Sequence, residues 1–419
     1  MAEQTKVKTL EKVVIRFSGD SGDGMQLTGT IFSNLSAVFG NEISTFPDYP
    51  AEVRAPQGTL SGVSGFQVHL GSRKIFTPGD KADVLVAMNP AALKVNVKHL
   101  KPNAIVLIDT DSFKKSDLDK ALFTTDDPFT ELGLTGVQVV AAPISTMVKD
   151  GLVEFGLDNK SALRCKNMFA LGLVCWLFER PLEEAMHMLQ NKFAKKPVIA
   201  QANIKALTDG YNYGNNIHAS VSTYRIESKK AEPGFYTDVN GNKATSYGLI
   251  AAAEKAGLQL FLGSYPITPA TDILHELSKR KDLGVITVQA EDEIAGICTS
   301  IGASFAGCLA ATSTSGPGLA LKSEAIGLAV IAELPLVIID VQRGGPSTGL
   351  PTKSEQTDLM QALYGRNGES PAVVIAASTP TDCFDAAFWA GKLAVEHMTP
   401  VILLTDAFIA NGSSAWRIP

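Results

Sequence analysis

The chain has 419 residues, 45% of them apolar, with a net charge of −6 and an isoelectric point near 5.6. This length allows two or three domains with buried cores and excludes a small disulfide-stabilised scaffold. The acidic balance offers no basic surface for nucleic acid or anionic lipid, so we expect neither nucleic acid nor a membrane as a partner.

The cysteine and histidine pattern indicates a cytoplasmic protein without a metal of its own. The cysteines are few, odd in number and widely spaced, as is usual in a reducing compartment: Cys165, Cys175, Cys298, Cys308 and Cys383. No Cys-x-x-Cys occurs and the histidines are scattered, so the chain has no ligand set for zinc or an iron–sulfur cluster. Its longest apolar run, residues 328–341, is too short to span a bilayer.

The first half of the chain alternates short apolar runs with helical patterns. Strands are expected at residues 12–17, 83–88, 104–108 and 137–141, a helix at 26–39, and several helices between 161 and 213. Such alternation predicts an α/β domain with a parallel sheet and crossover helices. We place this domain at residues 1–225.

A glycine-rich loop follows the first expected strand and precedes a helix. Gly19, Gly22 and Gly24 are its glycines, an order that can build an anion-binding turn. The spacing is not that of a dinucleotide-binding fingerprint, and Asp20 and Asp23 place negative charge where a pyrophosphate would lie. We favour a tight turn used for packing or a subunit contact.

Residues 226–244 are polar, contain proline and glycine, and lack apolar periodicity, which indicates a linker. Strand and helix patterns resume in a second α/β domain at residues 245–419. It should begin with a helix at 245–256, and its strands are expected at 259–262, 285–288, 309–312, 336–341, 372–376 and 401–404. We expect the chain to be cut before a further domain.

Four loops that follow expected strands of the second domain are rich in glycine, proline and hydroxyl residues, and ligands of open α/β sheets bind at such strand ends. The first, 263–271, presents Thr268, although a helix cap explains it equally well. The second carries Glu291, Asp292 and Glu293 into a helix of small residues. These acids could be helix-dipole partners, or one of them could transfer a proton to a ring nitrogen.

The other two loops allow close approach of a ligand. Residues 312–318 combine hydroxyl groups with glycines, so that a ligand or a partner subunit can come near the backbone. In the last loop a single arginine, Arg343, leaves a strand into a glycine-rich segment. We favour a clamp for a substrate carboxylate over an ordinary surface arginine.

With these loops assembled, the chain resembles over its whole length the alpha subunit of 2-oxoacid:ferredoxin oxidoreductases of the 2-oxoglutarate type, with a gamma domain fused at the N-terminus. The motifs are YPITP at 265–269, EDE at 291–293, TSGPG at 314–318 and GPSTGLPT at 345–352. The resemblance implies an N-terminal Rossmann-like gamma domain and a domain of the pyrimidine-binding thiamine diphosphate fold with a parallel sheet. Gly19, Gly22 and Gly24 would mark the gamma domain's glycine loop.

The resemblance also implies the chemistry. Glu293 would face the pyrimidine N1′ of thiamine diphosphate, and Thr268 and Arg343 would contact the substrate carboxylate. Coenzyme A would take the acyl group, and a beta subunit would hold the diphosphate through Mg²⁺ and pass electrons from a [4Fe-4S] cluster to ferredoxin. Further cofactor-binding residues would be Tyr265, Pro266, Ile267, Glu291, Ser315 and Gly316, with Glu291 the alternative to Glu293.

Three alternatives remain open. Pyruvate or a branched-chain 2-oxoacid could replace 2-oxoglutarate, although the segment at 345–352 favours 2-oxoglutarate. A nicotinamide-dependent dehydrogenase would need a better glycine fingerprint than the loop after the first strand provides. A scaffold subunit that kept the fold without the chemistry would not need Glu293, Thr268 and Arg343.

Overall fold

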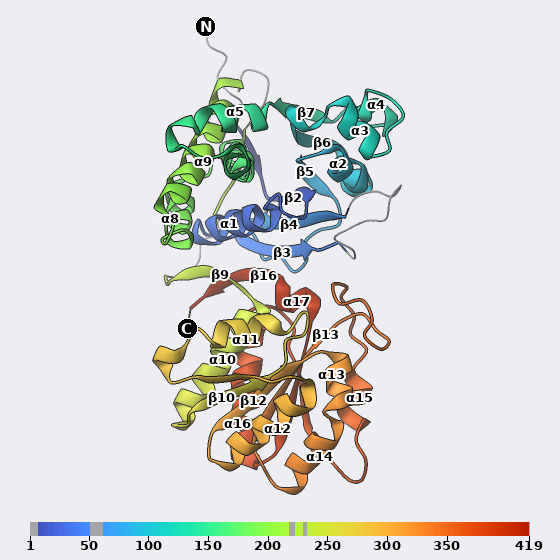
Figure 1. Ribbon diagram of the computed structural model, residues 1–419, viewed down its shortest axis with the longest axis vertical. Helices are drawn as coiled ribbons and strands as arrows, with labels where there is room; N and C mark the ends of the chain where they lie inside the picture. The colour runs from blue at the N-terminus through green and yellow to red at the C-terminus, as the bar shows by residue number, and fades with distance from the viewer. Residues whose placement is uncertain (1–6, 51–61, 218–222, 229–232, 419) are drawn as a thin grey trace. The chain divides into compact units, whose positions relative to one another are not determined.

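A computed structural model describes residues 7–50, 62–217, 223–228 and 233–418. The chain forms two compact units, each combining helices with a sheet (Figure 1). The first unit comprises Met1–Asp238 together with Ala415–Pro419, and the second comprises Val239–Ser414.

The first unit contains a mixed sheet with the strand order β7-β6-β5-β2-β4-β3-β16-β9. Its strands β2, β5, β6 and β7 are parallel, as expected, whereas β4 pairs antiparallel with both β2 and β3. The strands are β2 Lys12–Asp20, β3 Glu42–Asp48, β4 Val63–Gly71, β5 Ala82–Ala87, β6 Leu100–Asp109, β7 Gln138–Ala142, β9 Tyr236–Asn240 and β16 Ser413–Arg417.

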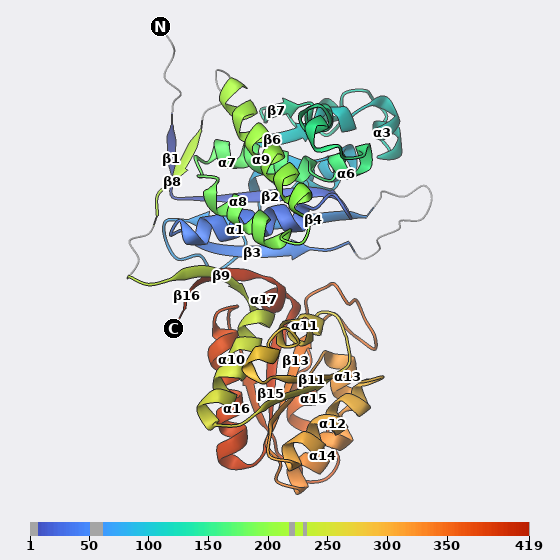
Figure 2. The ribbon, with the colours of Figure 1, turned by 60° about the vertical axis from the view of Figure 1, so that its left-hand side comes forward.

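Helices cover both faces of this sheet (Figure 2). Helix α7 is buried nearly all round and packs along α9, where Gly172 and Gly210 let the two backbones approach closely. The larger core lies under α1, α5, α7, α8 and α9, and a smaller one under α2. The helices are α1 Met25–Val38, α2 Pro90–Asn96, α3 Lys115–Lys120, α4 Pro128–Glu131, α5 Ile144–Gly151, α6 Asn159–Leu163, α7 Lys166–Leu177, α8 Glu183–Lys192 and α9 Pro197–Ile217.

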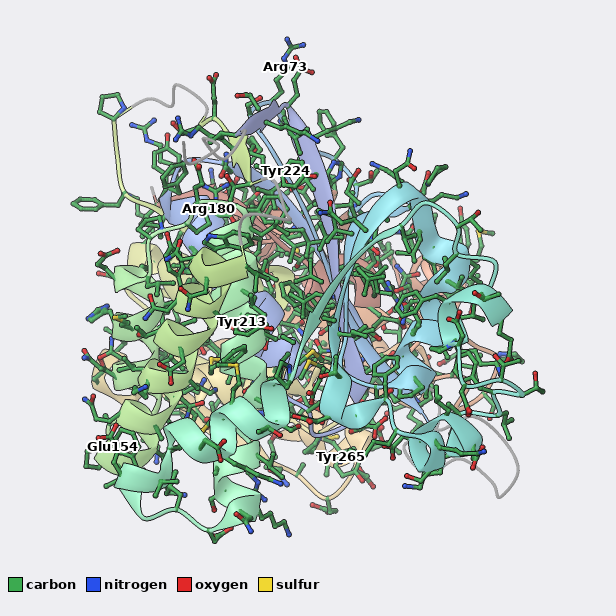
Figure 3. The ribbon with its side chains drawn as sticks, turned by 90° about the horizontal axis from the view of Figure 1, so that it is seen from above. Arg73, Glu154, Arg180, Tyr213, Tyr224 and Tyr265 are labelled. Carbon is green, nitrogen blue, oxygen red and sulfur yellow. The ribbon has the colours of Figure 1, made fainter. Side chains whose placement is uncertain are left out.

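A separate two-stranded parallel sheet joins β1 Lys8–Leu10 to β8 Tyr224–Ile226. Tyr224 packs against Phe178 with ring centroids 6.0 Å apart. Arg180, which follows Phe178 by two residues and is labelled with Tyr224 in Figure 3, is buried. Its guanidinium donates to Asn41 and stacks on the ring of Phe39. Burial lowers the pKa of Arg180 to about 10.

The second unit is built on an all-parallel sheet with the strand order β11-β10-β12-β13-β15-β14. Central strands β12, β13 and β15 are buried along their whole length, as is typical of strands covered on both faces. The strands are β10 Leu260–Ser264, β11 Ile286–Gln289, β12 Leu309–Thr314, β13 Leu336–Gln342, β14 Val373–Ala376 and β15 Pro400–Asp406.

Two helical layers enclose this sheet. One core forms with α10, α11 and α16, and the other with α12, α13, α14 and α15. The helices are α10 Gly241–Ala256, α11 Thr271–Leu277, α12 Glu293–Phe305, α13 Gly316–Leu321, α14 Ser323–Ile331, α15 Leu359–Tyr364, α16 Asp382–His397 and α17 Ala407–Asn411.

The predicted linker, residues 226–244, contains regular structure. Strand β9 occupies part of it, and α10 begins at Gly241, four residues before the predicted start, with Asn240 capping the helix by accepting from the backbone N–H of Lys243. Sequence periodicity missed β9 because five residues at a sheet edge carry little apolar alternation. Among the described residues, no helix combines the length and the apolar character needed to cross a bilayer.

Candidate functional site at the carboxyl edge of the second sheet

The four predicted loops follow β10, β11, β12 and β13, which confirms their placement at strand ends. In the parallel register Ser264 pairs with Gln289, and Thr314 pairs with Asp340. The strands therefore end at one edge of the sheet, and the loops gather there.

The loop after β10 is held from two sides. Asn242 of α10 donates to the carbonyl of Pro269 at 2.9 Å, and Arg343 donates to the carbonyl of Thr268 at 2.7 Å. The helix-cap interpretation of this loop is wrong, because α11 has Ala270 at its N-cap and no side-chain cap hydrogen bond. Thr268 and Tyr265 are exposed, while Pro266 and Ile267 are half-buried.

The three acids at the start of α12 lie in different environments. Asp292 caps the helix, since its carboxylate accepts from the N–H of Ala295 at 2.7 Å. Glu291 is exposed. Glu293 is half-buried and packs over Gly318 of α13, where an added Cβ would lie 2.8 Å from its Cγ and would also clash with Thr314. The dipole-partner interpretation thus fits Asp292, whereas the side chain of Glu293 packs against α13.

Small residues bring α12 close to the sheet. A Cβ at Gly263 would lie 2.6 Å from the carbonyl oxygen of Gly296 and 2.7 Å from the hydroxyl of Ser300. Ser300 also donates to the carbonyl of Ala311 at 2.8 Å. The glycines and serines of this helix therefore serve its packing against β10 and β12, which places Glu293 at the edge of the sheet.

Arg343 is buried at the end of β13 and ties two loops together. Its guanidinium donates to the carbonyl of Thr268 and, at 2.7 Å, to the carbonyl of Thr348, while its Nε has no partner among the described residues. Burial lowers the pKa of Arg343, and the charge of Glu293 acts in the opposite direction. Arg343 and Glu293 thus lie within electrostatic reach of one another.

A second cation, Lys322, contacts the backbone of Glu293. Lys322, between α13 and α14, is fully buried, and its Nζ donates to the backbone carbonyl of Glu293 at 2.5 Å. Burial lowers the pKa of Lys322 to about 8, against the opposite influence of Glu293 and Asp292.

A pair of carboxyl groups lies beside this cluster. Asp340 of β13 is fully buried, and neither of its oxygens accepts from a described donor. Its polar neighbour is the carboxyl of Asp358, so a hydrogen bond between the two requires a proton on one of them. Burial, together with Asp358, raises the pKa of Asp340 well above its usual range, and burial also raises the pKa of Asp358.

A pocket of about 490 Å³ opens between the start of α13 and the loop after β13. Gly316 makes room for Asp358, because a Cβ there would lie 2.6 Å from its carboxylate. The hydroxyl of Ser315, at the N-cap of α13, is buried and has no partner in the part of the chain that the structure describes. Residues that line the pocket include Gly316, Pro317, Arg343, Ser347, Glu355 and Asp358.

The predicted glycine loop belongs to the first unit, at the end of β2. Gly22 and Gly24 have φ values of 115° and 76°. The turn is closed by its own chain: Asp23 accepts from the N–H of Asp20 and pairs with Lys166 at 3.0 Å, and Asn167 donates to the carbonyl of Gly24. These contacts agree with a packing role.

Lys322, Asp340 and Asp358 were missed at the level of sequence. A signal existed for two of them, since Lys322 interrupts an apolar helical segment and Asp340 interrupts an apolar strand. Charged residues are almost never fully buried unless they are paired or functional. Asp358 carried no such signal.

Two family models match consecutive parts of the chain. Residues 14–213 match pyruvate ferredoxin/flavodoxin oxidoreductase, and residues 251–419 match the thiamine diphosphate-binding domain of pyruvate flavodoxin/ferredoxin oxidoreductase. The 2-oxoglutarate oxidoreductase subunit KorA of Mycobacterium tuberculosis is 54% identical over 98% of this chain. The chain belongs to the 2-oxoacid:ferredoxin oxidoreductase family.

Two further members of the family agree with this assignment. The 2-oxoglutarate synthase subunit KorA of Archaeoglobus fulgidus is 43% identical over 43% of the chain and 51% of its own length. The structure of 2-oxoglutarate:ferredoxin oxidoreductase from Magnetococcus marinus, with 2-oxoglutarate, coenzyme A and succinyl-CoA bound, matches 98% of the chain with a TM-score of 0.80 and 34% identity. The chain spans 63% of the M. tuberculosis relative and 66% of the M. marinus chain.

The carboxyl edge of the second unit fits the aminopyrimidine of thiamine diphosphate. A carboxyl group is the hydrogen-bond partner that a ring nitrogen requires, and the half-buried Glu293 could supply it; the buried hydroxyl of Ser315 has no partner among the described residues. Within the described ranges, no group of three or more histidine, cysteine, aspartate or glutamate side chains could hold a metal ion.

Proposed function

We propose that this chain is the alpha subunit of an enzyme that oxidatively decarboxylates 2-oxoglutarate and forms succinyl-CoA on thiamine diphosphate. In this proposal the first unit is the gamma domain and the second is the pyrimidine-binding domain. The observation that carries it is Glu293, half-buried at the carboxyl edge of the parallel sheet, with Lys322 and Arg343 close by.

Each side chain of this cluster has a distinct task. When bound, thiamine diphosphate supplies the carbon nucleophile for the 2-oxo group and a sink for the electrons that remain after carbon dioxide leaves. Glu293 holds a proton at N1′ of the pyrimidine, with Glu291 as the alternative acid. The segments around Tyr265, Pro266, Ile267, Ser315 and Gly316 line the ring.

Substrate recognition rests on Arg343 and Thr268. The guanidinium of Arg343 already bonds two backbone carbonyls, which fixes its plane, and no described residue bonds its Nε. A carboxylate of the 2-oxoacid can accept from such an arginine, and the exposed hydroxyl of Thr268 lies on the loop that Arg343 holds. The Arg343 clamp and the pocket of about 490 Å³ beside it suit a small dicarboxylate.

A partner subunit completes the enzyme in this proposal. It holds the diphosphate through Mg²⁺, carries a [4Fe-4S] cluster and passes electrons to ferredoxin. An exposed apolar surface on α12 and α14 supports a permanent partner, because Phe305 and Ile331 are 83% and 82% exposed and Ile294 and Leu328 lie on the same two helices. The five cysteines are unpaired thiols, which supports a cytoplasmic location.

The test is reconstitution of the full-length chain with its beta subunit. We expect reduction of ferredoxin or viologen that requires both 2-oxoglutarate and coenzyme A, at a higher kcat/KM than with pyruvate or branched-chain 2-oxoacids. Glu293→Gln should abolish this activity, and Glu254→Gln, an exposed change on α10, should leave it intact.

Each other outcome has a defined meaning. Retained activity in Glu293→Gln together with loss in Glu291→Gln would move the proton-holding role to Glu291. If the complex prefers pyruvate, pyruvate would replace 2-oxoglutarate as the proposed substrate. A complex loaded with cofactor that oxidises no 2-oxoacid would leave the scaffold alternative.

A further inference from the structure

Lys322 is buried where folding alone gives no reason for a cation. Its side chain is fully buried, and its ammonium, which has three donors, bonds a single backbone carbonyl and forms no ion pair with a described residue. It also lies at the N-terminal end of α12, where the helix dipole disfavours positive charge. Burying such a group is costly, so its presence calls for a function.

We infer that Lys322 is a positioning residue, which holds the first turn of α12 and places a positive charge beside Glu293. This inference rests on the proposed function, in which Glu293 holds the proton at the pyrimidine. The bond to the carbonyl of Glu293 fixes the backbone from which the carboxylate projects. Gly318, one turn before Lys322, leaves the space that the Glu293 side chain occupies.

The titratable groups around this pair come from two elements. Glu293, Asp292 and Cys298 of α12 and its cap face Lys322, and Arg343 faces Glu293 from the end of β13. Burial lowers the pKa of Lys322 to about 8, so its ammonium is charged at pH 7 and loses its proton as the pH rises through about 8. Turnover that depends on this charge should decline as the pH rises through about 8.

Stability distinguishes this role from a structural one. The folded-state pKa of Lys322 lies below its unfolded value of 10.5, so this lysine makes the chain less stable below pH 8 than above pH 10.5. Replacing it by methionine, which has a similar volume and no charge, should raise the melting temperature at pH 7 by about 2–5 °C. A lysine kept for packing would give the opposite sign.

The experiment compares Lys322→Met with Lys281→Met, an exposed control in the same unit. In the full-length chain alone we measure the melting temperature and the ¹³C carboxyl resonance of Glu293, identified by its loss in Glu293→Gln. In the complex with its beta subunit we measure kcat and KM against pH. For Lys322→Met we expect a higher melting temperature, a displaced resonance, and kcat at least tenfold lower with KM changed less than about threefold.

The contrary results are equally defined. A lower melting temperature in Lys322→Met, or a Glu293 resonance and a kcat that match those of Lys281→Met, would overturn the positioning role. If the wild-type complex oxidises no 2-oxoacid, the proposed function fails, while the resonance and melting data on the chain alone still decide whether Lys322 acts on Glu293.

Discussion

The two units both end a parallel strand in a glycine-rich loop, yet they treat the charges there in opposite ways. In the first unit Asp23 pairs with Lys166, and the buried Arg16 bonds Asn96, Gln67 and Asp48. In the second unit Lys322, Arg343 and Asp340 are buried, and no described residue of opposite charge lies in ion-pair contact with them. Buried polar groups left without partners cost stability, and such groups are concentrated at functional sites.

This contrast also separates two meanings of a glycine. Gly24 adopts a left-handed conformation and leaves room for Asn167, so it serves the fold of its own unit. Gly318 has ordinary helical geometry and leaves room for Glu293, so it serves the site. Similar glycine-rich motifs thus have different uses, and the neighbouring side chains identify which use applies.

The largest effect should come from removing the arginine. Arg343→Ala should lower kcat/KM for 2-oxoglutarate by about 10²–10³-fold, because it deletes a charged donor and unties two loops. Arg343→Lys should recover little, since an ammonium lacks the planar fork. Arg366, which also bonds backbone carbonyls, supplies the control Arg366→Ala, measured in the same steady-state assay. Equal losses in the two alanine variants would contradict a substrate contact.

A smaller loss of activity is expected from Gly318→Ala. The added methyl group would meet Thr314 and the Glu293 side chain. We therefore expect kcat to fall at least tenfold and the free energy of unfolding to fall by about 1–3 kcal/mol. Gly302→Ala is the matched control, because a Cβ at that exposed position of α12 meets nothing within 4 Å. It should leave kcat unchanged and raise the unfolding free energy by up to about 1 kcal/mol. Kinetics and denaturant unfolding of both variants check this.

The carboxyl pair should appear in the pH dependence of stability. Because the pKa of Asp340 is raised above its unfolded value of 3.8, its contribution is fully present below that pH and is lost as the pH rises through the folded pKa. Asp340→Asn cannot lose a proton and keeps a donor for Asp358. Melting curves from pH 5 to 9 should therefore show the variant gaining on the wild type as pH rises. The exposed change Asp282→Asn should run parallel to the wild type, and the same parallel course for Asp340→Asn would mean that the pair shares no proton.

The smallest effect is predicted for the glycine loop of the first unit. Asp23→Asn removes the ion pair with Lys166 and should lower the unfolding free energy by about 1 kcal/mol, with kcat and KM of the complex within about twofold of wild type. Calorimetry and steady-state assays measure both quantities. A large rise in KM for any substrate would instead identify the loop as a ligand site.

Much of this architecture was predictable from local patterns. Apolar runs located the parallel strands of both units to within a few residues, and their alternation with helices predicted the α/β class. The positions of Glu293, Thr268 and Arg343 at strand ends followed from the loops that contain them. Strands β3 and β4 were missed because Ser44, Thr45 and Gln67 are buried polar residues that break the apolar pattern.

The order of residues by itself determined which segments become strands and where glycine, proline and hydroxyl residues gather, since these signals act over a few neighbours. Only the tertiary structure decided that Asp292 caps a helix while Glu293 packs against α13, that Lys322 reaches the carbonyl of Glu293, and that Asp340 meets Asp358. The physical reason is that burial and pairing of a charge depend on which distant elements pack beside it, and short-range patterns carry no information on that packing.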